Sequence, residues 1–187
     1  MHPELQYLWA MTDRFATLDA ALTIIDRTPT VLRGLVDALE TPALEPGAGA
    51  GWGPRQVTEH LLDVEDIAFM DRMRRVVDAG VNGKRPFICS IDPPGRLLEG
   101  GYAARPLEEL LGELEQRRAR DVAWLRSLAP DALDNQGEHD RAGIFAARDL
   151  VHYWACHDLL HLRQIVNALQ DTLTPFVGNL SMFFEEV

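Results

Sequence analysis

The sequence predicts an all-α protein, a four-helix bundle with one long crossover loop and an extra N-terminal helix. Apolar residues recur with helical periodicity in four separate segments. Alternating strand patterns bounded by turns are almost absent, so we expect no strands. A chain of 187 residues is long enough for one domain with a sizeable core. We expect residues 28–187 to form this domain, preceded by a helical extension over residues 1–27.

The extra helix is expected over about residues 3–25, before the bundle. The first bundle helix is predicted to begin at Thr28, which can act as an N-cap, with Pro29 at the first helical position. Its apolar face follows the helical period and contains Val31, Leu32, Leu35, Val36 and Leu39.

The other three bundle helices have clear start or stop signals. Pro54 and Gly80 are predicted to begin and end the second helix. Pro106 opens the third, which stops near Pro130. The fourth is expected over residues 144–170. The second helix has an inward stripe formed by Val57, His60, Leu61, Val64, Ile67 and Ala68.

The connection over residues 81–105 is long and rich in proline and glycine. These residues interrupt both helices and strands. We expect it to cross the surface without a regular element, as long functional loops often do.

Composition excludes several classes of partner and compartment. The net charge of −11 argues against binding to nucleic acid or to an anionic membrane surface, because both need clustered cations. No signal peptide and no apolar run of about 20 residues is present. Cys89 and Cys156 form no CxxC pattern, which favours a reduced cytoplasmic protein with free thiols. We expect Cys156 to be a small packing residue.

Three histidines are candidate ligands for one divalent metal. His157 and His161 lie four residues apart in "HDLLHLRQI", which places both rings on one side of a helix. That spacing alone is weak, but both residues continue the inward stripe of Leu150 and Trp154. His60 lies on the inward stripe of the second helix, and helix bundles build metal sites from facing helices in this way.

Neighbouring polar residues have less specific roles. His152 is rotated about 140° from His157 and is expected on the surface, and His139 lies in a turn-like segment where it can cap local backbone. We expect Asp158 to be solvated or paired between helices. Gln164 can either hydrogen-bond a ligand imidazole or tie two helices together. Trp154 is expected in the core, with a pocket wall as the alternative.

Three segments together resemble the DinB-like metal-dependent four-helix-bundle superfamily, over about residues 28–170. They are "GWGPRQVTEHLLDVEDIAFMDRMRRVV", "YAARPLEELLGELEQRRARDVAWLRSL" and "GEHDRAGIFAARDLVHYWACHDLLHLRQI". The shared features are Trp52, an "HLxDxE…R" run that includes His60, and a closing "HDxxHLxQI". The resemblance implies that His60, His157 and His161 hold zinc or nickel. It also implies a homodimer and, from studied members, a low-molecular-weight thiol such as bacillithiol or mycothiol.

Three functions remain open at this point. The first is a metal-dependent thiol S-transferase acting on a small-molecule substrate, because an open metal position holds a thiol as the reactive thiolate. A metal-dependent hydrolase is the second, and a non-catalytic metal-binding stress or interaction module the third. "HDLLH" also resembles the HExxH motif of zinc peptidases. That function would need a further ligand, for which Glu185 is the candidate, and a sheet edge that the sequence does not predict.

Overall fold

The computed structural model describes residues 17–37 and 52–184, the last three of these by their backbone alone. The main helices are α2 (Leu18–Asp37), α4 (Pro54–Val64), the π-helix η1 (Glu65–Met70), α5 (Asp71–Gly80), α6 (Pro93–Glu99), α7 (Leu107–Ser127) and α8 (Ala147–Leu173). Short 3-10 helices are η2 (Tyr102–Ala104), η3 (Pro130–Asp134), η4 (Thr174–Phe176) and η5 (Gly178–Phe184). Residues 3–16 of the predicted extra helix, and Glu185, lie outside the described residues.

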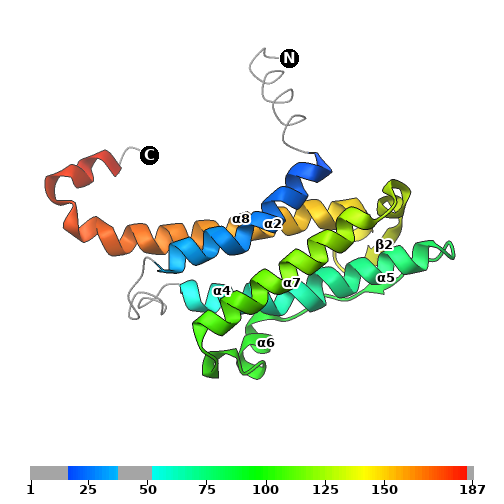
Figure 1. The fold of residues 1–187 in the computed structure, drawn as a ribbon, viewed down its shortest axis with the longest axis horizontal. Helices are drawn as coiled ribbons and strands as arrows, with labels where there is room; N and C mark the ends of the chain where they lie inside the picture. The colour runs from blue at the N-terminus through cyan, green and yellow to red at the C-terminus, as the bar shows by residue number, and fades with distance from the viewer. Residues whose placement is uncertain (1–16, 38–51, 185–187) are drawn as a thin grey trace, which may run out of the picture.

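Four long rods make up the bundle, which confirms the predicted fold (Figure 1). They are α2, the continuous run α4–η1–α5, α7 and α8. The second rod begins at Pro54 and ends at Gly80, as the start and stop signals predicted. The third and fourth rods also occupy the predicted segments, although the fourth begins only at Ala147. Helix α8 extends beyond the other rods at its C-terminal end (Figure 1).

The predicted start of the first bundle helix at Thr28 is wrong. Helix α2 runs without a break from Leu18 through Pro29 to Asp37, so the predicted domain boundary at residue 27 falls inside a helix. A proline cannot donate to the carbonyl four residues earlier, here that of Ile25. That carbonyl instead accepts a hydrogen bond of 3.1 Å from Arg118 Nη1. A partner from another helix therefore satisfies the group that the proline leaves free.

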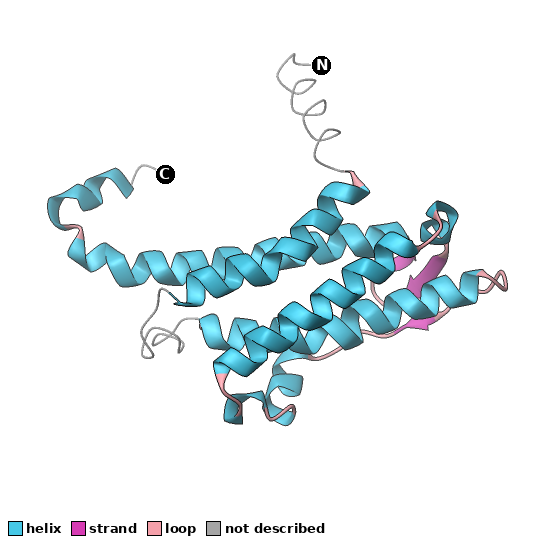
Figure 2. Cartoon of the chain, in the orientation of Figure 1, coloured by secondary structure: helices cyan, strands magenta, loops and turns pink. Residues whose placement is uncertain are grey.

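The expectation of no strands is also wrong. Strands β1 (Phe87–Ile88), β2 (Gln136–His139) and β3 (Gly143–Ala146) form a small sheet, with β1 parallel and β3 antiparallel to β2 (Figure 2). Each strand has at most four residues, too few to show the alternation by which a strand is recognised.

The crossover over residues 81–105 contains β1, α6 and η2, so it is not the irregular loop that was predicted. Side chains of α4 attach it to the bundle. Arg55 donates to the carbonyl of Arg105 over 2.6 Å, and the Asp63 carboxylate accepts two hydrogen bonds from Arg96 and one from Tyr102. The crossover therefore packs on α4 close to His60.

The core consists of two apolar clusters at the two ends of the bundle. One contains Ile25, Phe69, Val122 and Trp154, among others, and the other contains Leu32, Leu61, Leu114 and Ile165, among others. Val31, predicted on the apolar face, is instead 46% exposed. Between the clusters each rod carries buried polar residues, which are Thr28, His60, Glu65, Arg118, Asp121, Asp158 and His161. We call this set the polar layer.

Arg118 connects all four rods through the polar layer. Its Nε donates to Glu65 Oε2 of η1 over 2.9 Å, and its Nη1 donates to the Asp158 carboxylate of α8 and to the Ile25 carbonyl of α2. The guanidinium also lies over the Trp154 ring, 4.9 Å from its centroid. Only 1% of this arginine is exposed, so these contacts replace the water it has lost.

Glu65 holds a proton in the folded protein near neutral pH. Burial raises the pKa of Glu65 to about 8, although Arg118 opposes the shift. Its Oε1 has no hydrogen-bond partner among the described residues. Burial also raises the pKa of Asp158, although Arg118 again opposes the shift, so the guanidinium faces two carboxyl groups that burial moves toward the protonated form.

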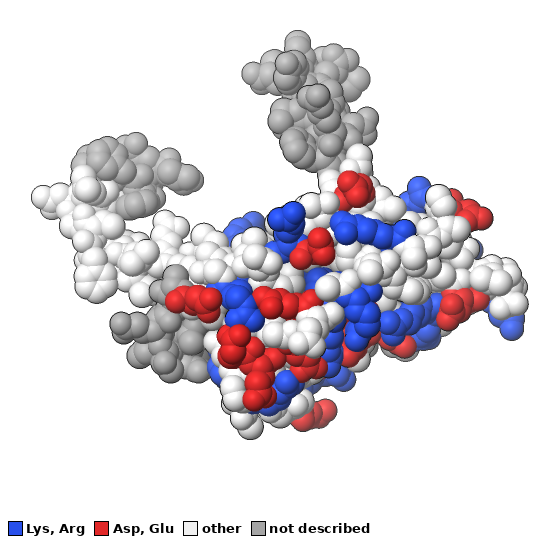
Figure 3. Space-filling model, viewed as in Figure 1, with Lys and Arg blue, Asp and Glu red and all other residues white. Residues whose placement is uncertain are grey.

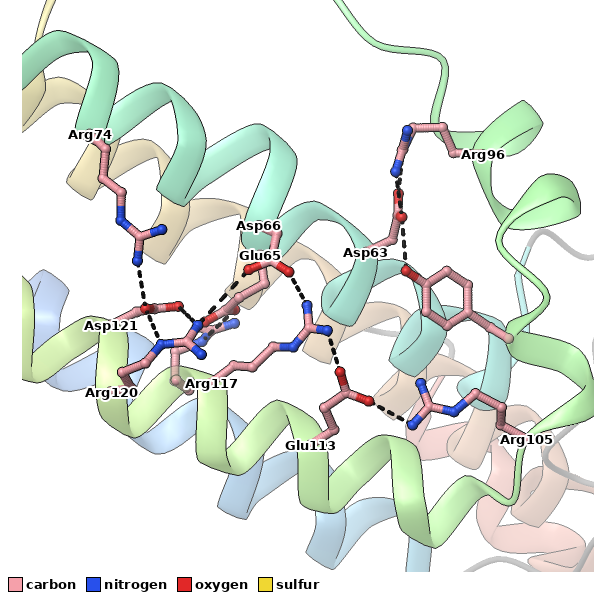
Figure 4. Close-up of polar contacts among 12 residues, drawn as sticks. Asp63, Glu65, Asp66, Arg74, Arg96, Arg105, Glu113, Arg117, Arg120 and Asp121 are labelled. Atoms are coloured by element: carbon pink, nitrogen blue, oxygen red, sulfur yellow. Dashed lines mark hydrogen bonds and ion pairs between the residues drawn. The ribbon is translucent and has the colours of Figure 1, made fainter.

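Ion pairs on the outer face of α7 are of a different kind. Arg117 bridges Asp66 and Glu113, Arg105 pairs with Glu113, and Arg74 and Arg120 both approach Asp121 (Figure 4). Acidic and basic side chains are mixed over this face, whereas the projecting end of α8 carries none in the same view (Figure 3). The pairs of Arg117 and Arg105 are partly exposed and contribute little each, whereas the Asp121 side chain is buried. No described helix has the length and apolar character needed to cross a membrane.

Replacing Arg118 by methionine should lower the free energy of unfolding by about 3–5 kcal/mol, because it leaves a buried carboxylate and a buried carbonyl without partners. Urea denaturation measures the change. The control is Arg126→Met on the same helix, whose contact with Asp26 spans 4.0 Å at the surface and whose loss should cost less than about 1 kcal/mol. Equal losses for the two variants would contradict a central role for Arg118.

The Glu65→Gln variant should gain stability over the wild type as pH rises. The folded pKa of about 8 exceeds the usual 4.5, so the folded state binds one more proton than the unfolded state between these values. Wild-type stability from this group is therefore complete below about pH 4.5 and lost as pH rises through 8. Urea denaturation of both proteins at pH 5, 7 and 9 tests this. A difference that does not change with pH would refute it.

Candidate metal centre

Two histidines of the polar layer, His60 and His161, meet His157 at one point between α4 and α8. His157 Nε2 lies 3.2 Å from His60 Nε2 and 3.2 Å from His161 Nε2. All three candidate ligand atoms lie within 4.8 Å of one another. The structure therefore brings together the three residues that the sequence singled out.

This arrangement fits a divalent cation. Two nitrogens bound at 2.0–2.1 Å with tetrahedral angles lie about 3.3 Å apart, close to the spacing observed. Gln164 Oε1 lies 2.6 Å from His161 Nδ1. An amide oxygen can only accept a hydrogen bond, so this contact requires the proton of the His161 ring to lie on Nδ1. The Nε2 lone pair of His161 then points at the other two rings. Such a contact to the second ring nitrogen is the usual way in which a ligand imidazole is oriented.

Burial keeps the three imidazoles neutral, as metal ligation requires. It lowers the pKa of His60 to about 4 and that of His157 to about 3, and it also lowers the pKa of His161. The Nδ1 atoms of His60 and His157 are buried without a hydrogen-bond partner among the described residues. All three rings can therefore offer a lone pair at neutral pH without first losing a proton.

Aromatic rings enclose the histidines on two sides. The Trp52 ring lies 4.6 Å from that of His60, and the Phe69 ring lies 5.2 Å from that of His157 in an edge-on contact. Trp154 stacks on the far side of Phe69 at 4.7 Å and is fully buried, so it is a core residue, as expected. His157 is only partly buried, whereas His60 and His161 are buried.

The neighbouring polar residues divide between the site and its support. Asp158 is paired between helices, with Arg118. Gln164 bonds a candidate ligand, the first of its two predicted roles. His139 Nδ1 accepts the backbone N–H groups of Arg141 and Ala142, which is the predicted local capping role.

Two further residues lie away from the cluster. His152 Nδ1 lies 2.8 Å from the Arg148 carbonyl on its own helix. Cys156 was expected to be a buried packing residue, and this is wrong because its thiol is free and exposed. Position 156 is turned by about 100° from His157 around the helix axis, and no described rod covers that face.

Sequence reasoning missed Arg118 and Phe69. Arg118 lies four residues after Leu114 and four before Val122, at an apolar position of its helix, and this spacing was a usable signal for a buried charge. Phe69 lies within the π-helix η1, where the α-helical period no longer gives the facing of a side chain. No pattern in the sequence marks that turn.

Comparisons with known proteins agree with this fold. The family model of the DinB superfamily matches residues 24–165. The fold is similar to that of YfiT from Bacillus subtilis, described as "a probable metal-dependent hydrolase with an unusual four-helix bundle topology", with a TM-score of 0.73 and 19% sequence identity. The likeness covers 83% of this chain and 87% of that one. No protein with a curated description matches the sequence.

Metal affinity should change little between pH 8 and pH 6 and should weaken as pH falls toward 4. The lowered pKa values mean that protons compete for the rings only under acid conditions, whereas exposed imidazoles begin to protonate near pH 6.5. Competition with a chelator of known zinc affinity, repeated across this range, measures the dissociation constant. A loss of about tenfold or more in affinity between pH 8 and 6 would contradict the neutral, buried state of the rings.

Proposed function

Because this chain belongs to the DinB superfamily, we propose that it is a metal-dependent enzyme with a divalent ion, zinc or nickel, on His60, His157 and His161. We further propose that it transfers a low-molecular-weight thiol to a small-molecule acceptor. The convergence of three neutral Nε2 atoms beside a partly exposed ring carries the first proposal. When bound, such an ion supplies an open position that lowers the pKa of a thiol or water toward neutrality.

The protein's own residues orient the ligand imidazoles and enclose the histidine cluster. Gln164 fixes the tautomer and ring direction of His161. Trp52 and Phe69 shield two sides of the cluster from water, which strengthens electrostatic interactions there. Reactants are then confined to the side of His157.

The surrounding carboxylates favour thiol transfer over hydrolysis. The Asp63 carboxylate is held by Arg96 and Tyr102, and that of Asp158 by Arg118. Among the described residues, no carboxylate hydrogen-bonds any of the three rings. Hydrolysis benefits from a general base that takes a proton from water, whereas a thiol is acidic enough to react as thiolate without one. A hydrolase remains the second candidate, favoured by the similarity in fold to YfiT.

We also propose that the protein is a cytoplasmic homodimer. The free, exposed Cys89 and Cys156 support a reducing compartment. Exposed apolar residues on α8 support a second copy as partner, and they include Leu159, Leu160, Val166 and Leu173.

His161→Ala should abolish stoichiometric metal binding, because it removes one of three ligands and the one that Gln164 orients. The control is His152→Ala on the same helix, which should leave the metal content unchanged because that ring contacts the Arg148 carbonyl instead. Elemental analysis of each variant, purified without added metal, measures the metal content and distinguishes these outcomes. Full metal content in the His161→Ala variant would refute the assignment of ligands.

The thiol-transfer proposal predicts metal-dependent adduct formation. Metal-loaded protein would be incubated with 1-chloro-2,4-dinitrobenzene and either bacillithiol, mycothiol or glutathione, with the His161→Ala protein as control. We expect an adduct with at least one thiol in the wild type only. Ester turnover without thiol would favour the hydrolase, and no turnover in either assay would favour a non-catalytic metal-binding protein.

A further inference from the structure

A second cavity lies beside the candidate metal centre. It has a volume of about 350 Å³, and its lining includes Arg72, His139, Phe145, Asp149, Leu150 and Tyr153. These residues come from α5, from the strands β2 and β3, and from the first turns of α8. The small sheet that the sequence did not predict therefore forms one wall.

Ring contacts link this cavity to the metal centre. Tyr153 lies one helical turn before His157, and their ring centroids are 6.0 Å apart. Phe69 touches both rings, at 5.9 Å from Tyr153 and 5.2 Å from His157. Four residues of α-helix rise about 6 Å, so the wall of the cavity at Tyr153 lies about one helical turn from His157.

Arg72 gives this cavity a cation without a close counter-ion. Its Nη2 donates to the Cys89 carbonyl over 2.8 Å, and no described carboxylate lies within 4.0 Å of its guanidinium. Burial, its largest influence, lowers the pKa of Arg72 from its usual value, although Tyr153, Asp140 and Asp71 oppose the shift. Arg75, one turn along α5, is by contrast paired with Asp71.

Two other polar side chains of the cavity lining are His139 and Asp149. His139 Nδ1 contacts the backbone N–H groups of Arg141 and Ala142 and lies 3.1 Å from Asp140 Oδ1, so local contacts hold this ring in place. Asp149 is the one carboxylate in the lining, and its Oδ2 accepts the N–H of Ala146 at the start of α8. A ligand with a second anionic group would be repelled by Asp149.

We propose that this cavity binds the acceptor substrate and that the acceptor is a monoanionic acid with an apolar body, held by Arg72. The carboxylate would receive hydrogen bonds from the Arg72 guanidinium, and the apolar body would pack against Phe145, Leu150 and Tyr153. The acceptor's reactive atom would then face His157, about one helical turn away. This inference rests on the proposed function, because it assigns the substrate class of the same site.

Binding of 3-phenylpropionate and its neutral isostere 3-phenylpropanamide tests the assignment. Calorimetry with metal-loaded wild-type protein should show the acid bound about tenfold or more tightly than the amide, the difference expected for a charge-assisted hydrogen bond. Arg72→Gln should abolish this preference and Arg72→Lys should retain part of it. The matched control, Arg75→Gln, should leave it unchanged. Metal content should be the same in all four proteins.

Three results would overturn the inference. They are equal binding of the acid by wild type and Arg72→Gln, no preference for the acid in the wild type, and tighter binding of 3-phenylpropylamine than of the acid. The first would mean that the acid binds elsewhere, for example on the metal. Each result leaves the metal content and the thiol assay intact as separate tests, so failure here is distinguishable from failure of the proposed function.

Discussion

The arrangement of the bundle depends on the buried guanidinium of Arg118. An arginine stays charged in a protein, so once it is buried the surrounding chain must supply acceptors for it. Asp158 and Glu65 supply two from neighbouring rods, and Pro29 releases a third by leaving the Ile25 carbonyl free. Each acceptor comes from a different rod. The four rods are therefore fixed at one level by electrostatic contacts, with apolar packing above and below that level.

The histidine cluster lies at the same level of the bundle. His60 precedes Glu65 by five residues on one rod, and Asp158 lies between His157 and His161 on the other. Contacts that hold Glu65 and Asp158 therefore also hold the two helices from which the imidazoles project. The carboxyl group of Asp158 is engaged by Arg118 in this role, and the carboxylate of Asp63 is engaged by Arg96, which attaches the crossover. At this level of the bundle the charged side chains thus position the helices, whereas the neutral imidazole nitrogens are left to bind a ligand.

The sequence predicted the rods and the histidine cluster because both depend on spacing along one helix. Pro54, Gly80 and the period of the apolar residues located helices, and the four-residue interval between His157 and His161 located the site. Features that depend on contacts between distant segments were missed. Pro29 has the sequence environment of a helix start, and only the Arg118 side chain explains why it is tolerated inside α2. The strands are likewise defined by pairing between residues 87–88 and 138–139, about fifty positions apart.

The π-helical turn η1 separates two halves of one rod, of which one carries a candidate metal ligand and the other carries part of the cavity wall. His60 lies before it, and Arg72 lies after it. A π-turn contains one residue more than an α-helical turn, and each residue of an α-helix rotates the chain by about 100°. Deletion of the one extra residue from η1 would therefore restore a regular α-helical turn and leave the cavity wall carried by α5 facing nearly as it does now. A related chain could gain or lose this residue, and so reposition the side chains within the turn such as Phe69, without altering any ligand of the metal or the facing of Arg72.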